Sequence, residues 1–168
     1  AVSPSAVGVD IGCGMCAVKT SLKVEDIPQE VLRKQILRGI RKQVPLGFDH
    51  HKAAQDEAYM PQGFDIDNLT VVRRQYESAK KQVGTLGGGN HFIELQKDAE
   101  GTLWVMIHSG SRNLGAQVGG FYNEKAKVMN RRWFSCVAPE IDMAFLPMQS
   151  EEAHQYWNEM NYCVEFAL

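Results

Sequence analysis

The chain has 168 residues, which is about one domain and long enough to bury a core. Its apolar fraction of 44% and charged fraction of 23% are those of an ordinary globular protein. The formal net charge of −2 excludes attraction to nucleic acid by bulk charge, so such a partner would need a local basic patch. No apolar run approaches the roughly 18 residues of a membrane span. Because the four cysteines are scattered, we expect a reduced, cytoplasmic setting rather than a disulfide framework.

The first third of the chain alternates short apolar runs with glycine. Residues 6–12 are predicted to form a buried strand that ends in a Gly-rich turn, and residues 16–22 a second strand. Residues 28–44 are predicted to form a helix, because proline suits a first turn and Leu32, Ile36 and Ile40 recur at helical spacing. The other side of this helix is basic, and both a solvated face and an RNA-facing patch are open interpretations of Arg33, Lys34, Arg38, Arg41 and Lys42.

The middle of the chain begins with a long polar connection over residues 45–68. His50 and His51 are expected to be loop residues rather than ligands, because adjacent side chains of an extended segment point in opposite directions. A second basic helix is predicted over residues 68–83. Strands are predicted over residues 91–97 and 103–108, joined by a turn near residues 99–101. The later strand is apolar on both faces, which is typical of a central strand.

The last third is predicted to be mostly helical, with a loop over residues 109–115, a helix over 116–134, an irregular stretch over 139–149 and a helix over 151–168. The pattern of the last helix continues to Leu168. We therefore expect the 168 residues to be a single segment of a longer catalytic domain, truncated at both ends. We also expect one face of the last helix to be uncovered, namely Tyr156, Met160, Val164 and Ala167.

A glycine-rich stretch, GTLGGGNHFIE over residues 84–94, is the densest concentration of polar and permissive residues. Its three consecutive glycines leave the backbone free to adopt positive φ, and their N–H groups can form an anion-binding nest. Asn90 and His91 then lead into the predicted strand. The alternative is a Gly-rich turn with an incidental histidine. No Gly-Lys-Ser/Thr follows, so the stretch is not a Walker A loop.

Four side chains beside Gly-rich turns are candidate metal ligands: Asp10, Cys13, His91 and His108. Asp10 and Cys13 are three residues apart across a turn, so both can reach one ion, or the thiolate can bridge two. This donor set suits Zn²⁺, Co²⁺, Mn²⁺ or Fe²⁺ without choosing between them. Taken singly, Cys13 could instead fill a core, and His108 could be a satisfied core histidine.

The loop after the predicted central strand offers hydroxyls and a guanidinium. Ser109, Ser111 and Arg112 together suit a phosphate. A metal pair beside a phosphate-binding loop indicates phosphoryl or nucleotidyl transfer.

Three stretches in order, GVDIGCGM at residues 8–15, GTLGGGNHFIE at 84–94 and HSGSR at 108–112, resemble motifs of the RtcB family of RNA-splicing ligases. The resemblance implies an α+β fold particular to the family, with mixed or antiparallel sheets and helices around a central metal cleft. It also implies an enzyme that joins RNA 2′,3′-cyclic phosphate or 3′-phosphate ends to 5′-hydroxyl ends with GTP and two Mn²⁺ ions, through a histidine–GMP intermediate.

The resemblance also implies roles for individual residues. Cys13 would bridge two Mn²⁺ ions, and Asp10, His91 and His108 would be further ligands, which makes Cys13 and the two histidines catalytic. Asn90, His91 and Glu94 would contact GTP, and RNA phosphate would be bound by Arg112, Ser109 and Ser111.

The family pattern is not complete in these residues. Its third ligand histidine and its guanylylated histidine have no matching motif here, and His154 lies outside either motif's context. The segment alone is therefore expected to be inactive. A metal-dependent phosphoesterase and an inactive metal-binding structural fragment are the alternatives. Cys13 is expected to be reduced and not paired with Cys16.

Overall fold

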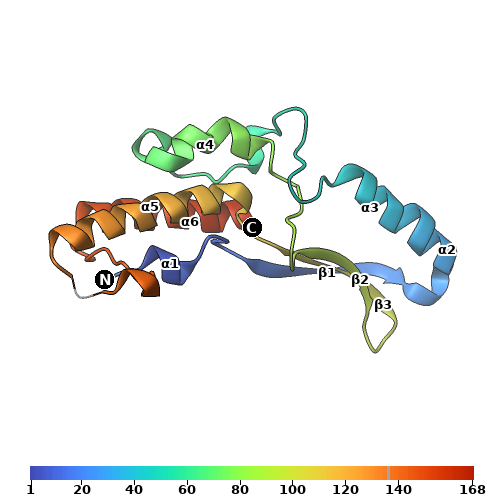
Figure 1. Cartoon of the computed structure of the whole chain (residues 1–168). Coiled ribbons are helices and arrows are strands. Elements are labelled where there is room, and N and C mark those ends of the chain that lie inside the picture. Colours follow the sequence, from blue (N-terminus) through green and yellow to red (C-terminus); the bar gives the residue numbers. More distant parts are fainter. Residues whose placement is uncertain (136) are drawn as a thin grey trace. The chain divides into compact units, whose positions relative to one another are not determined.

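The structure, a computed structural model, describes residues 1–135 and 137–168 and has an α+β fold, as predicted (Figure 1). It divides into two compact units. One unit comprises Ala1–Cys13, Ala54–Val83 and Gly110–Leu168, and the other comprises Gly14–Ala53 and Gly84–Ser109. Within the described ranges, no helix combines the length and the apolar character needed to cross a membrane.

The unit formed by Gly14–Ala53 and Gly84–Ser109 contains a small antiparallel sheet. Its strands are β1 (Gly14–Lys23), β2 (Phe92–Lys97) and β3 (Thr102–Ser109), in the order β1-β3-β2. Three of the four predicted strands, those over residues 16–22, 91–97 and 103–108, are therefore confirmed, as is the central place of β3. β1 is exposed along most of its length, as an edge strand of an open sheet can be.

The β2–β3 hairpin is closed by Asp98. One carboxylate oxygen accepts a hydrogen bond from the backbone N–H of Thr102 at 2.7 Å, and the other accepts one from the Trp104 indole at 2.9 Å. Gly101 completes the turn with a φ of 80°. A side chain that bonds its own turn fixes the strand register. In that register His108 lies opposite both Met15 and Phe92.

One continuous helix accompanies the sheet, as predicted for residues 28–44. It comprises α2 (Gln29–Val31), a π-helical segment (Leu32–Leu37) and α3 (Arg38–Gln43). Its apolar side lines a groove whose other walls include residues of the polar connection, the Gly-rich loop and β2; the groove is lined by Leu37, Ile40, Arg41, Val44, Leu46, Leu86 and Ile93.

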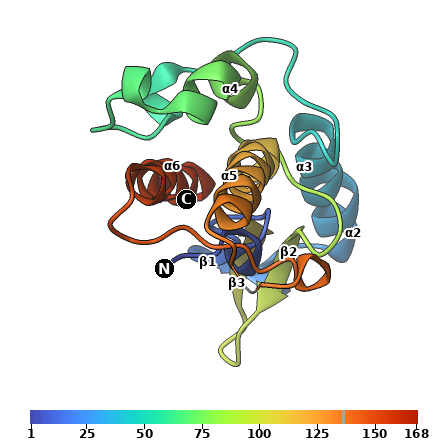
Figure 2. The same ribbon diagram turned by 60° about the vertical axis from the view of Figure 1, so that its left-hand side comes forward.

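The other unit is helical and holds the main core. Its helices are α1 (Pro4–Val7), α4 (Thr70–Lys80), α5 (Arg112–Arg132) and α6 (Glu151–Ala167), of which α5 and α6 lie side by side (Figures 1 and 2). The buried residues of α5 lie along one face of the helix, at spacings of three and four. They are Leu114, Gly115, Val118, Gly119, Tyr122, Ala126 and Asn130. In this unit short 3₁₀ turns occupy Glu57–Tyr59, Ile66–Asn68 and Pro139–Ile141. A further 3₁₀ turn, Val24–Asp26, follows β1 in the unit that holds the sheet.

A buried carboxylate joins three of these helices. Glu159 of α6, 1% exposed, accepts hydrogen bonds from the backbone N–H groups of Val71 at 2.8 Å and Val72 at 2.7 Å. Its other oxygen accepts one from the Tyr122 hydroxyl at 2.7 Å. Since no side chain of its own caps α4, Glu159 satisfies N–H groups that the first turn of a helix otherwise leaves unpaired.

The predicted strand over residues 6–12 is wrong. Pro4 at the first helical position begins α1, and Gly8 follows it with a φ of 87°. Gly12 has a φ of 75°, so neither end of the stretch is extended. The stretch packs on α5 instead: a Cβ on Gly119 would lie 3.1 Å from the Gly8 carbonyl oxygen. α5 itself begins at Arg112, earlier than the predicted residue 116.

The prediction of an uncovered face on α6 is also wrong in most of its residues. Tyr156 is fully buried and packs against Tyr122 with ring centroids 5.2 Å apart. Met160 and Ala167 are half-buried, and Val164 alone of the four is exposed. α5 supplies the cover that the sequence pattern did not reveal.

Candidate metal centre

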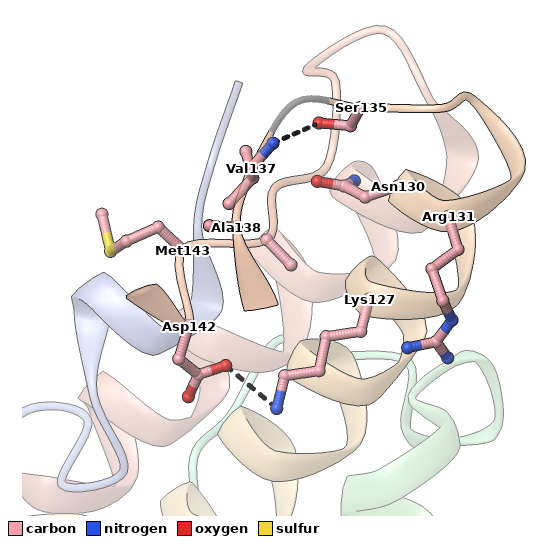
Figure 3. A pocket seen from close by; sticks show the side chains of 9 residues that line it. Lys127, Asn130, Arg131, Ser135, Val137, Ala138, Asp142 and Met143 are labelled. Atoms are coloured by element: carbon pink, nitrogen blue, oxygen red, sulfur yellow. Dashed lines mark hydrogen bonds and ion pairs between the residues drawn. The ribbon is translucent and has the colours of Figure 1, made fainter. Parts of the chain in front are cut away.

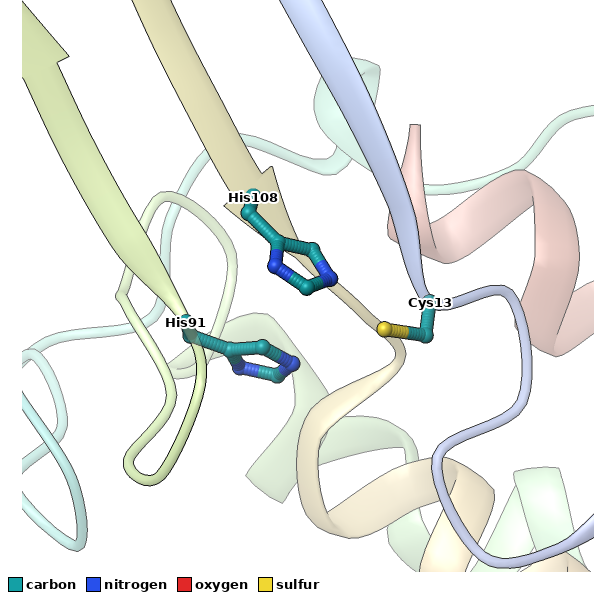
Figure 4. Close-up of side chains that lie close together, drawn as sticks. All are labelled: Cys13, His91 and His108. Carbon is teal, nitrogen blue, oxygen red and sulfur yellow. The ribbon is translucent and has the colours of Figure 1, made fainter.

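Three candidate ligands meet at one end of the sheet: Cys13, His91 and His108 (Figure 4). Cys13 directly precedes β1, His91 directly precedes β2, and His108 is the last but one residue of β3. Because β3 runs antiparallel to both neighbours, its end meets both of their beginnings. One ligand atom of each residue lies within 4.8 Å of the others, which is close enough for one ion to reach all three.

The two imidazoles are held by aromatic contacts as well as by strand register. The rings of His91 and His108 are 5.3 Å apart between centroids, at 62°. Phe92 packs edge-on against His108, with centroids 5.5 Å apart. No sequence pattern indicates this role for Phe92, because only the strand register places it opposite His108. This packing restricts the rotamers of His108, which helps to preorganise a ligand.

Asp10 is next to the cluster but is not one of the three residues in it. Its carboxylate is hydrogen-bonded to the Cys13 thiol. Burial raises the pKa of Cys13, and the hydrogen bond to Asp10 and the negative charge of Asp10 raise it further. Asp10 therefore holds the proton on this thiol in the metal-free protein, whereas a bound metal ion would replace that proton.

The Asp10 carboxylate occupies space that a side chain at Gly110 would fill. A Cβ on Gly110 would lie 2.8 Å from the Asp10 carboxyl carbon and 3.0 Å from one of its oxygens. The residue at this position therefore has to be glycine for the carboxylate to lie where it does. Gly110 lies inside the HSGSR motif of residues 108–112, but its contact with Asp10 depends on the fold and has no signal in the sequence.

Cys13 and Cys16 are not joined by a disulfide in the described part of the chain, which confirms that prediction. Cys16 pairs in register with Ile107, whereas His108 is the next residue along β3. Since successive side chains of a strand point to opposite faces, Cys16 and His108 lie on opposite faces of the sheet.

The three residues expected to bind phosphate, Arg112, Ser109 and Ser111, differ in how accessible they are. Arg112 begins α5 with a φ of 58°, a conformation that side-chain-bearing residues rarely adopt and that often marks functional sites. Burial lowers the pKa of its guanidinium, and the charge of Asp10 opposes that change. Ser109 is half-buried. Ser111 is fully buried near Gly115, so its hydroxyl is not open to a phosphate in this arrangement.

The Gly-rich loop borders a hollow beside His91. This hollow is lined by Gly87, Gly88, Gly89 and His91 together with Leu46, Gly47, Phe48 and Asp49. Asn90 is exposed in the turn, and Gly89 has a φ of 68°. Glu94 is exposed on β2 and lies two residues after Phe92, so it shares the face of His108.

The remaining histidines and a separate pocket are not part of this cluster. His50 and His51 lie in the polar connection, as predicted, and His154 is exposed on α6. A pocket between the end of α5 and the segment that follows it contains Lys127 and Arg131 (Figure 3). Lys127 pairs there with Asp142 at 2.9 Å.

An α+β chain in which a thiol and two imidazoles converge at strand ends belongs among proteins able to hold a divalent metal ion. The profile of the family described as tRNA-splicing ligase RtcB matches residues 1–65 and 57–168. The chain therefore belongs to the RtcB family.

Individual relatives agree with this assignment. The chain is similar to an RNA-splicing ligase RtcB of Escherichia coli, with 30% identity over 181 residues that cover 99% of this chain and 44% of the relative. A tRNA-splicing ligase RtcB of Thermococcus kodakarensis is 28% identical over 211 residues, covering 99% of this chain and 43% of the relative. The chain thus spans less than half the length of these curated relatives.

Proposed function

We propose that this chain is the metal-binding segment of an RNA ligase that joins 2′,3′-cyclic phosphate or 3′-phosphate ends to 5′-hydroxyl ends, using GTP and Mn²⁺. The convergence of Cys13, His91 and His108 within 4.8 Å is the observation that carries the proposal, together with membership of the RtcB family. The sheet and helices would form part of the family's fold around a metal cleft, within a longer catalytic domain.

The donor set fits a divalent transition metal. One thiolate and two imidazoles suit Zn²⁺, Co²⁺, Mn²⁺ or Fe²⁺. The choice of Mn²⁺, and of two ions with Cys13 as the bridge, comes from the family resemblance. A bound ion would act as a Lewis acid on phosphoryl oxygens and neutralise charge that develops during transfer.

The chain's own residues would bind and orient the substrates around that ion. Asp10 is hydrogen-bonded to the thiol of Cys13 and would be a further ligand after a small shift. The backbone of the Gly-rich loop and Asn90 would contact GTP phosphates, and Glu94, on the face of His108, would contact the nucleotide. Arg112 would present its guanidinium fork to an RNA phosphate, with Ser109 beside it.

The natural protein that contains these residues provides the test. With Mn²⁺, labelled GTP and RNA bearing a 3′-phosphate and a 5′-hydroxyl, we expect a covalent protein–GMP adduct and joined RNA. Cys13→Ala should abolish both, and Cys16→Ala, on the opposite face of the sheet, should keep both. Hydrolysis of a cyclic phosphate without adduct or joining would instead support a phosphoesterase.

The 168 residues by themselves are expected to form no GMP adduct. Five histidines are present, of which His91 and His108 are assigned to the metal. No motif resembling that of the guanylylated histidine surrounds the other three. Labelled GMP on the isolated chain after denaturing electrophoresis would contradict the assignment of the nucleophile to another part of the protein.

A further inference from the structure

The continuous helix formed by α2, the π-helical segment and α3 carries a concentration of positive charge. Five exposed cations lie on it against a single carboxylate, Glu30, although the chain as a whole has a net charge of −2. We call these residues the basic face: Arg33, Lys34, Arg38, Arg41 and Lys42. Lys34 pairs with Glu30 at 2.6 Å. The other four form no ion pair within the described residues, so their charges are not neutralised by the protein.

The π-helical segment gathers these cations on one side. An α-helix turns by about 100° per residue, and on that geometry the five cations would spread over roughly half of the circumference. A π-helix has wider turns, because its hydrogen bonds join residues five apart. Over Leu32–Leu37 the smaller turn per residue narrows the spread to about a quarter of the circumference. Arg33, Lys34 and Arg41 line one shallow hollow, together with Glu30, the ion-pair partner of Lys34.

The rest of the helix surface orients the basic face. The aliphatic side chains of Leu37, Ile40 and Val44 line the groove that Ile93 of β2 and Leu86 of the Gly-rich loop also line. Arg41 also lines this groove, but its side chain is exposed, as are the other four cations of the basic face. Alternating charges are typical of a solvated helix face, whereas like charges this close repel each other. This repulsion is relieved when a polyanion binds.

We infer that the basic face binds the phosphate backbone of the RNA strand on which the protein acts. The inference rests on the proposed function for the identity of the polyanion, and on the charge and geometry of the helix for the surface. Three of the five cations are arginines, whose planar forks bind phosphate oxygens in pairs. Such contacts are independent of sequence and position a nucleic acid without reading its bases. Because the bulk charge of the chain is slightly negative, RNA binding depends on this local surface.

The test compares two triple variants of the 168-residue chain. The first, Arg33→Gln, Arg38→Gln and Arg41→Gln, neutralises the basic face. The second neutralises three exposed cations of α4, the turn that follows it and α5, by Arg73→Gln, Lys81→Gln and Arg132→Gln. Both change the net charge by the same amount, and all six side chains are exposed, so far-UV circular dichroism should show no loss of helix.

Binding of labelled single-stranded RNA is measured by fluorescence anisotropy at several salt concentrations. A chelator keeps the assay free of metal ions, and the RNA has ends that cannot react. Each phosphate contact to a single strand contributes about 0.7 to the slope of log affinity against log salt. Loss of three contacts should therefore lower the slope by about 2, and affinity at 0.1 M salt by about a hundredfold. The second triple variant should retain most of the slope.

The outcomes separate this inference from the proposed function. Equal losses in both triple variants, no loss in the first, or no RNA binding by the unmodified chain would each overturn the inference. Tighter binding to vesicles of an anionic lipid than to RNA, through the same three arginines, would also overturn it. Because the assay contains no metal ion, none of these results depends on Cys13, His91 or His108, whose role is tested separately by metal binding.

Discussion

Glu159 offers a sharp test of how the helical unit is held together. Replacing it by alanine removes the acceptor of three hydrogen bonds, two to the first turn of α4 and one to the Tyr122 hydroxyl of α5. All three bonds are 2.7–2.8 Å long and buried, so water does not readily replace the lost carboxylate. The substitution therefore leaves the donors of Val71, Val72 and Tyr122 buried without their acceptor.

The expected loss in the free energy of unfolding is the balance of two opposing contributions. Hydrogen bonds to a charged group contribute about 1.5–3 kcal/mol each, so three of them suggest about 4.5–9 kcal/mol. Removing the carboxylate also removes its own desolvation penalty, which is several kcal/mol for a buried ion. A net loss of about 3–5 kcal/mol remains, which is a large part of the roughly 5–15 kcal/mol that stabilises a domain.

Urea unfolding followed by circular dichroism measures this loss. With a slope of about 2 kcal/mol per molar urea, the midpoint for Glu159→Ala should fall by about 2 M. The midpoint for Glu159→Gln should fall by clearly less. The amide oxygen of glutamine can accept hydrogen bonds from the two N–H groups, while its NH₂ group donates one to the Tyr122 hydroxyl. Glu165→Ala alters an exposed residue of the same helix and should change the free energy of unfolding by no more than about 0.5 kcal/mol. Equal midpoints for Glu159→Ala and Glu165→Ala would refute the reasoning.

Two further predictions concern other parts of the structure. Gly110→Ala should displace the Asp10 carboxylate and weaken metal binding, measured by calorimetry, at least several-fold. A Cβ on Gly120 would meet no atom within 4 Å, so Gly120→Ala should leave the metal affinity unchanged. Equal affinities of the two variants would contradict the close contact between residue 110 and Asp10. Burial, and then the charge of Glu159, raises the pKa of Cys163 from 9.0 to about 12. A raised folded-state pKa contributes stability that is complete below pH 9 and lost as the pH rises through 12. Cys163→Ala should therefore flatten the loss of stability between these values in urea titrations, and an unchanged pH profile would contradict this.

Much of the secondary structure could be predicted from the sequence, because it depends on local periodicity. The helix over 151–168 and the hairpin of β2 and β3 follow from spacing and turn residues. The strand predicted over residues 6–12 is not formed, although Val7, Val9 and Ile11 alternate as apolar residues of a strand do. Two glycines with positive φ and the close approach to Gly119 of α5 decide its structure, and both are tertiary effects. The cap of α4 by Glu159, 88 residues from Val71, was likewise out of reach of sequence spacing.

The candidate site was partly predictable for a related reason. His91 and His108 stand at the ends of predicted strands, and Cys13 lies in the turn before the strand predicted over residues 16–22, which begins at Gly14 in the structure. The antiparallel pairing of these strands is enough to bring the three residues together. The burial of Ser111 was not predictable, because it results from packing beside Gly115 in α5. The burial of its hydroxyl therefore argues against the contact with RNA phosphate that was expected for Ser111, and leaves Arg112 as the residue of this loop proposed to make it.

The most direct test of the central claim is a Co²⁺ titration of the chain followed by absorption spectroscopy. Co²⁺ accepts the same donors as the other divalent ions considered, and a bound thiolate gives a charge-transfer band that imidazole and carboxylate do not. The unmodified chain and Cys16→Ser should show this band, Cys13→Ser should lose it, and His91→Ala or His108→Ala should weaken binding. A band that persists in Cys13→Ser, or no band with any form of the chain, would contradict a metal centre built on Cys13, His91 and His108.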